Sequence, residues 1–152
     1  MAGLLIIAHA PLASSLKAVA CHTFPDCGAQ LIALDVWPDT PIEEVEASAR
    51  EALEHVRDPD ALIFTDVFGA TPCNVAQRLA SSTEGGQVKL IAGVNVPMLW
   101  RSLSYAHEPI DTLVVRAMAG ASQGVMHVAS SRPQNQASKP GGHDQNHAHH
   151  QQ

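Results

Sequence analysis

The first strand of this 152-residue chain is expected at residues 3–8, which read GLLIIA. Every residue in the run is apolar or glycine, and the run is far shorter than the roughly 20 residues that a membrane helix needs. A strand with one solvent-exposed face alternates apolar and polar residues. An uninterrupted apolar run is instead typical of a strand buried on both faces of a parallel sheet. This stretch therefore predicts an α/β fold.

Four more runs of the same kind are separated by segments long enough to hold a helix. They lie at residues 30–36 (QLIALDV), 61–65 (ALIFT), 88–92 (VKLIA) and 112–116 (TLVVR). This alternation predicts a three-layer α/β sandwich with a mostly parallel central sheet. Since crossovers between parallel strands are right-handed, we expect the flavodoxin-like strand order 2-1-3-4-5.

The clearest helix signal lies between the second and third runs. Apolar residues recur on one stripe from residue 42 to about Val56. Thr40 is expected to cap this helix, with Glu43 completing a capping box, and Asp58-Pro59 to end it. Prolines just after three of the apolar runs are expected in the first turns of further helices: Pro11, Pro72 and Pro97.

Composition divides the chain into a patterned domain, residues 1–129, and a polar tail, residues 130–152. The tail contains no Ile, Leu, Val or aromatic residue. It cannot bury enough apolar surface to offset the entropy of ordering, so we expect it to be disordered. A non-catalytic binding protein with a weak metal site in this tail is one alternative, but a solvated low-complexity tail is the simpler interpretation. The histidines in question are His143, His147, His149 and His150.

Charge and cysteine content restrict the possible partners and compartment. The formal net charge of −6 argues against a nucleic-acid partner, which would need a basic surface. No basic segment precedes the first apolar run, so we expect a cytoplasmic protein without a signal peptide. Cys21, Cys27 and Cys73 are odd in number and form no CxxC pair. We therefore expect free cysteines in a reducing compartment, and no metal centre.

The expected strand order also locates a site. Ligands of open α/β sheets bind beyond the carboxyl ends of the strands, where the strand order reverses. Here that point lies between the first and third strands, which are followed by His9 and Asp66. A carboxylate that accepts a hydrogen bond from one imidazole nitrogen fixes the tautomer and leaves the other nitrogen nucleophilic. His9 and Asp66 are the candidate catalytic residues.

The segment that begins at Asp66 is suited to holding a phosphoryl group. Gly69 permits close backbone approach, Thr71 is expected to be the N-cap, and Pro72 opens the helix. Free N–H groups and the helix dipole at such a start attract anions. Asn95, in the loop after the fourth strand, is a further candidate, although it could simply stabilise a turn. The chain has no Walker lysine motif and no GxGxxG, so neither a nucleotide nor another cofactor is expected.

Three segments resemble the signatures of the mannose-type IIA family of the bacterial sugar phosphotransferase system. They are residues 6–10 (IIAHA), 66–74 (DVFGATPCN) and 92–99 (AGVNVPML), and the resemblance covers about residues 3–129. It implies that His9 accepts a phosphoryl group from phospho-HPr through Nε2 while Asp66 orients Nδ1. It also implies that Thr71 and nearby amides, such as those of Gly69 and Ala70, contact the phosphoryl oxygens, and that the protein is a homodimer.

The resemblance leaves the onward step open. A IIB component would be the acceptor, and any association with the membrane would be indirect, through transporter components. No IIB domain follows the IIA-like segment, so a regulatory protein without onward transfer is an alternative. A phosphocarrier domain related to the dihydroxyacetone kinase system is another. The sugar is not readable from the sequence.

Overall fold

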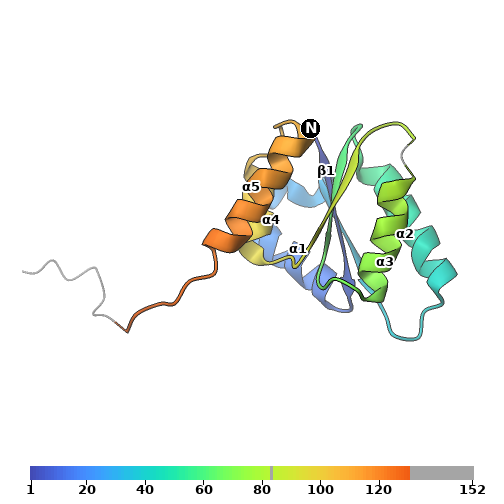
Figure 1. Cartoon of the computed structure of the whole chain (residues 1–152), viewed down its shortest axis with the longest axis horizontal. Coiled ribbons are helices and arrows are strands. Elements are labelled where there is room, and N and C mark those ends of the chain that lie inside the picture. Colours follow the sequence, from blue (N-terminus) through green and yellow to red (C-terminus); the bar gives the residue numbers. More distant parts are fainter. Residues whose placement is uncertain (83, 131–152) are drawn as a thin grey trace, which may run out of the picture.

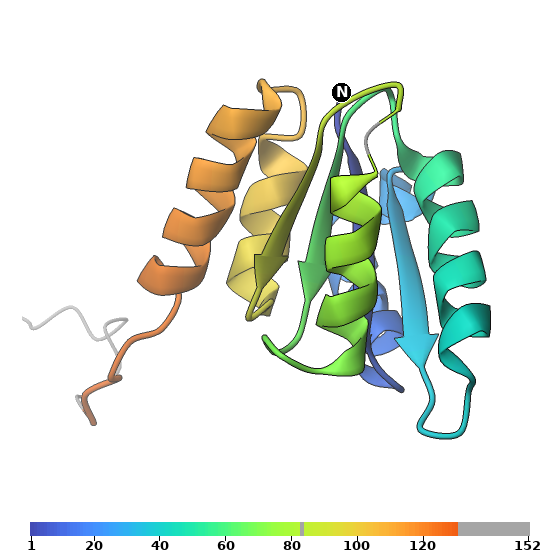
Figure 2. The same ribbon diagram turned by 45° about the vertical axis from the view of Figure 1, so that its right-hand side comes forward.

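The computed structural model describes residues 1–82 and 84–130, and within them four parallel strands form one sheet. The strands are β1 (Gly3–His9), β2 (Leu31–Val36), β3 (Ala61–Thr65) and β4 (Val88–Ala92). Their order is β2-β1-β3-β4, and all pairs are parallel. The α/β fold and the order 2-1-3-4 are confirmed for the first four expected strands. Figure 2 shows that the strands end at a common edge.

Helices cover both faces of the sheet (Figure 1). Leu4, Ile6 and Ala8 of β1 pack into the core beneath the first group of helices, whereas Leu5 and Ile7 pack into the core beneath the second group. These β1 side chains are fully buried, as the unbroken apolar run predicts. The first group is α1 (Leu12–Thr23), α4 (Val96–Ser104) and α5 (Ile110–Gln123), and the second is α2 (Ile42–Val56) and α3 (Thr71–Ser81).

The expected fifth strand at residues 112–116 is wrong, because these residues lie inside α5. Ile110, Leu113, Ala117 and Gly120 are its buried residues, and their spacing of three or four is that of one helix face. The five-residue run looked continuously apolar only because it was too short to reveal this period. Val115, within this run, is 67% exposed, which a strand buried on both faces would not allow.

The start of α2 also differs from expectation. Pro41 occupies the N-cap position, and no side chain caps the helix. The capping box between Thr40 and Glu43 is therefore not formed, and the backbone of Thr40 instead closes a turn by donating to the carbonyl of Trp37. The end of the helix, at Val56, agrees with the prediction.

Cys21 and Cys27 form a disulfide, so the expectation that all three cysteines are free is wrong. Cys21 lies in the last turn of α1, and Cys27 lies in the 3-10 helix η1 (Pro25–Ala29) that follows. The chain folds back between these two elements and brings the two Cα atoms to 5.9 Å, a distance that a disulfide can bridge. Residue spacing alone does not reveal such a reversal. Cys73 is free and buried in α3.

The predicted disordered tail, residues 130–152, lies outside the described residues except for Ser130. The proposal of a metal site at His143, His147, His149 and His150 also lies outside them. Within the described ranges, no helix combines the length and the apolar character needed to cross a bilayer.

Candidate active site

His9 and Asp66 lie side by side because β1 and β3 are neighbours. Ile7 pairs with Thr65 in the sheet, so the chain positions that follow these two residues emerge together at the carboxyl edge. Nδ1 of His9 lies 2.7 Å from Oδ2 of Asp66. The backbone N–H of His9 donates to the same oxygen at 3.1 Å, and that of Val67 donates to Oδ1 at 3.0 Å. The carboxylate of Asp66 therefore takes part in three hydrogen bonds.

This contact determines which ring nitrogen is reactive. An ionised carboxylate can only accept a hydrogen bond, so Nδ1 of His9 carries the proton and Nε2 keeps its lone pair. The side chain of His9 is 52% exposed, whereas that of Asp66 is 14% exposed. The ring thus presents a nucleophilic nitrogen at an open edge, and its supporting carboxylate is shielded from water.

The carboxyl of Asp66 has a lowered pKa. Partial burial by itself raises this pKa, but the hydrogen bonds from the ring and backbone of His9, the charge of His9 and the N–H of Val67 together outweigh burial. Each of these groups stabilises the ionised form. Asp66 is consequently an anion at neutral pH, as an acceptor of the Nδ1 proton must be.

The loop from Asp66 to α3 leaves a series of backbone donors unused. Gly69 has a φ of +87°, a left-handed conformation that favours glycine. Ala70, rather than Thr71, occupies the N-cap position, and no side chain caps the helix. Five amides of this region donate no hydrogen bond within the described residues, namely those of Phe68, Gly69, Ala70, Thr71 and Cys73. Together with the dipole of α3 they form a binding site for an anion.

Two of the other helices that begin at this edge, α1 and α4, already have side-chain acceptors. The N–H and the hydroxyl of Ser14 in α1 donate to the carboxylate of Asp35 on β2, at 3.0 and 2.5 Å. Asn95 caps α4 by accepting from the N–H of Met98 at 2.9 Å. α2 also starts at this edge without a side-chain cap, but it follows β2, which is not a neighbour of β3. The free amides at the start of α3 directly follow Asp66, so an anion beside His9 is best accommodated there.

Asn95 thus has a structural role, which was one of the two alternatives that the sequence allowed. Its side-chain oxygen accepts from Met98, and its amide nitrogen donates to the carbonyl of Ala121 at 3.4 Å. Both ends of the side chain are used to hold α4 and α5 together. A contact between Asn95 and a phosphoryl group stays a prediction.

Sequence reasoning missed two supporting residues. Asp35, the partner of Ser14, carries no motif, and only the pairing of β2 with β1 shows that it reaches α1. Thr65 is fully buried, and its carbonyl accepts from the N–H groups of Gly93 and Val94 at 2.9 and 3.0 Å. This carbonyl ties the loop after β4 to the end of β3, and so steadies the residue before Asp66.

The described residues contain no group of three or more His, Cys, Asp or Glu side chains placed to hold a metal ion. A groove of about 610 Å³ lies away from His9 and is lined by residues that include Phe24, Trp100 and Tyr105.

Known proteins that are similar to this chain include components of phosphotransferase systems. A family model described as "PTS system fructose IIA component" (EIIA-man) matches residues 3–118. A comparison with curated proteins gives no match. Among solved structures, a phosphotransferase system component EIIA from Streptococcus agalactiae has a TM-score of 0.76 at 19% identity, covering 84% of this chain and 97% of its own.

Two further solved structures are similar in the same way. The mannose/sorbose-specific IIA subunit from Enterococcus faecalis has a TM-score of 0.76 at 19% identity, with 87% of this chain and 98% of its own covered. A PTS IIA protein associated with a fucose utilization operon of Streptococcus pneumoniae has a TM-score of 0.69 at 21% identity, with 84% and 96% covered.

Proposed function

Because the chain belongs to the mannose-type EIIA family of the sugar phosphotransferase system, we propose that His9 accepts a phosphoryl group from phospho-HPr and passes it on. Membership of the family supports a phosphotransfer role in sugar uptake in general terms. The observation that carries the specific proposal is the 2.7 Å contact between Nδ1 of His9 and the carboxylate of Asp66. It leaves Nε2 as the only ring nitrogen able to attack phosphorus.

The proposed step is an in-line transfer between two histidines. Nε2 of His9 forms a bond to phosphorus while the P–N bond to the donor imidazole breaks, and that imidazole leaves as a neutral ring once it is protonated. Positive charge that develops on the ring of His9 is stabilised by Asp66. The amides of Gly69, Ala70 and Thr71, with the hydroxyl of Thr71, are proposed to hold the phosphoryl oxygens. Little further chemistry is required, because phosphoryl transfer depends mainly on position and charge.

A IIB component is the proposed acceptor, and the reaction is proposed to take place in the cytoplasm. The return step uses the same groups in reverse, because His9 then becomes the leaving group. Nothing in the described residues favours the regulatory alternative or the dihydroxyacetone kinase alternative over this one.

We also propose that the chain acts as a homodimer. After α5 the backbone runs on with Val125, Met126 and Val128 at 76, 69 and 79% exposed. β4 is an edge strand, and its outer side pairs with no other strand in the described residues. An apolar extended segment and an unpaired strand edge are features that a second copy can cover.

Phosphorylation can be tested with labelled phosphoenolpyruvate, enzyme I and HPr. The protein should acquire label that is lost in acid and kept in base, as expected for a phosphohistidine. His9→Ala should abolish the labelling, whereas His107→Ala, which alters another exposed histidine, should not. Absence of label in the unchanged protein, or full labelling of His9→Ala, would show that the proposal is wrong. Transfer from the labelled protein to a IIB protein tests the onward step.

A further inference from the structure

The edge of the sheet that carries His9 is acidic and has no basic side chain in its loops. The segments that meet there are residues 9–15, 35–44, 66–74 and 93–99, and none of them contains Lys or Arg. A phosphoryl group adds about two negative charges at neutral pH. The chain's own loops supply backbone donors for it but no cation. The carboxylates in these segments are Asp35, Asp39, Glu43, Glu44 and Asp66.

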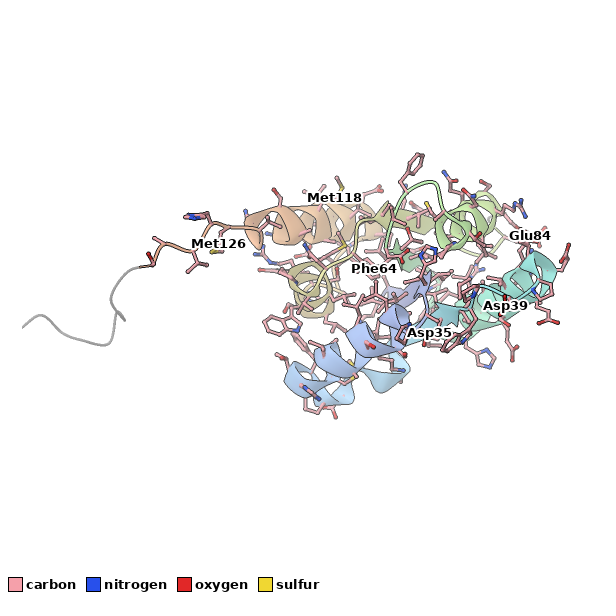
Figure 3. The ribbon with its side chains drawn as sticks, turned by 90° about the horizontal axis from the view of Figure 1, so that it is seen from below. Asp35, Asp39, Phe64, Glu84, Met118 and Met126 are labelled. Atoms are coloured by element: carbon pink, nitrogen blue, oxygen red, sulfur yellow. A yellow bond between two sulfur atoms is a disulfide. The ribbon has the colours of Figure 1, made fainter. Side chains whose placement is uncertain are left out.

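The same edge exposes two large aromatic side chains. Trp37, directly after β2, is 59% exposed, and Phe68, two positions after Asp66, is 75% exposed. β2 and β3 are the two neighbours of β1, so these aromatic residues lie in the loops on either side of the one that holds His9. In Figures 1 and 2 the loop between β2 and α2 projects beyond the other loops of this edge. Figure 3 looks onto the edge and labels Asp35 and Asp39 there.

We propose that Trp37 and Phe68 are the anchors of a docking surface for the protein that donates the phosphoryl group, and that this donor presents an apolar face rimmed by Lys or Arg. The inference rests on the proposed function of His9. Exposed aromatic residues near the centre of a contact carry much of its binding energy. The cation that the phosphoryl group needs is then brought by the donor, and acidic residues around the anchors attract the donor's basic rim.

Charge argues against other occupants of this surface. An anionic membrane or a nucleic acid would be repelled by Asp39, Glu43 and Glu44, and so would the same acidic edge of a second copy. The apolar residues that we assign to the dimer, Val125 and Val128, lie after α5 in a different part of the chain. A basic protein that carries the phosphoryl group therefore fits this edge best.

The aromatic anchors can be tested by phosphorylation kinetics with two donors. Trp37→Ala and Phe68→Ala should each raise the KM for phospho-HPr about tenfold or more, with kcat little changed. Phosphoramidate, a small donor that needs no docking surface, should phosphorylate His9 of Trp37→Ala at the unchanged rate. Trp100→Ala is the matched control, because Trp100 is the chain's other tryptophan, is 41% exposed and lies on α4. Its KM for phospho-HPr should equal that of the unchanged protein.

The acidic rim is tested by salt and by charge reversal. The KM for phospho-HPr should rise with salt concentration, because exposed charges are screened over about 10 Å at 0.1 M. Glu43→Lys combined with Glu44→Lys should raise the KM at low salt and flatten this dependence. Glu51→Lys, farther along α2, is the control. It should change neither the KM at low salt nor the dependence of the KM on salt.

The possible outcomes separate this inference from the proposed function. If His9 is never labelled, the proposed function fails. If His9 is labelled but Trp37→Ala and Phe68→Ala keep the KM of the unchanged protein, the docking surface is wrong and the function stands. A lower rate with phosphoramidate in Trp37→Ala would also overturn the inference, because this aromatic side chain would then act on the chemistry of His9.

Discussion

Asp66 controls His9 through a single carboxylate oxygen, which accepts from both the ring and the backbone of that histidine. This pair was predictable, because two residues that follow neighbouring parallel strands must meet at one edge. The donors around it were not predictable from the sequence. Thr71 was expected as the N-cap of α3, but Ala70 takes that position, and a helix start without a side-chain cap leaves more amides free for a ligand.

Asp66→Asn should slow the phosphorylation of His9 by about a hundredfold or more while the fold survives. An Asn side chain can donate to Nδ1, which would leave the proton on Nε2 and remove its lone pair. The rate is measured with excess phospho-HPr, and the fold by circular dichroism. Asp35→Ala is the contrasting variant, because it removes the acceptor at α1. It should lower the free energy of unfolding by about 1 kcal/mol and keep the phosphorylation rate.

The lowered pKa of Asp66 also predicts how this residue contributes to stability. A carboxyl whose pKa is lower in the folded protein stabilises the fold above its unfolded pKa, about 3.9. That contribution is lost as the pH falls through the folded pKa. Asp66→Asn should therefore be less stable than the unchanged protein at pH 7, and the difference between the two should be smaller near pH 3. Because His9 is half exposed, the difference should be about 1 kcal/mol or less. Urea unfolding at both pH values measures it, and an equal deficit at both would contradict the assignment.

At the scale of elements, the sequence predicted the buried strands well and the last one badly. Residues 3–8 and 61–65 are buried on both faces, so their unbroken apolar runs left little ambiguity. Residues 112–116 also contain three consecutive apolar residues but belong to α5, where only one face is buried. A run of five residues is too short to distinguish these cases, and the longer spacing from Ile110 to Ala117 was needed.

The disulfide between Cys21 and Cys27 depends on a chain reversal at η1, which no residue pattern signals.

The start of α3 provides a test at this scale. Gly69→Ala should destabilise the protein by about 1 kcal/mol, because the left-handed conformation disfavours a side chain. It should also slow phosphorylation, since the loop must shift its free amides to relieve the strain. Gly28→Ala is a matched control. A side chain would meet no neighbour within 4 Å at either position, but only Gly69 has a positive φ. If both variants behave alike, the conformation of Gly69 does not matter to the site.

At the scale of the whole molecule, the candidate site lies at the carboxyl ends of the strands, and β4 lies at one side of the sheet with its outer side unpaired in the described residues. A domain limit near residue 129 was expected from composition and stays a prediction. The dimer was expected only from family resemblance. The structure supports it with the exposed residues after α5 and the open edge of β4. Neither feature was visible in the sequence, because residues 125–128 show no pattern that distinguishes a buried segment from an exposed one.

Sedimentation velocity tests the dimer directly. The unchanged protein should sediment as a dimer, and Val125→Asp combined with Val128→Asp should sediment as a folded monomer, since buried unpaired carboxylates are costly. Val19→Asp, at a residue of α1 that is 39% exposed, should remain a dimer. A monomer in the unchanged protein at every concentration tested would show that the apolar segment is covered in some other way.

The contact between His9 and Asp66 is formed before any phosphoryl donor arrives. The imidazole therefore does not need to change its tautomer or rotate when the donor reaches it. The loss of entropy that orients the nucleophile has already occurred during folding. We therefore expect the rate of the proposed transfer to be limited by how often the two proteins collide and separate. Sucrose, which thickens the solvent, should accordingly slow transfer from phospho-HPr in proportion to viscosity, while transfer from phosphoramidate should hardly respond.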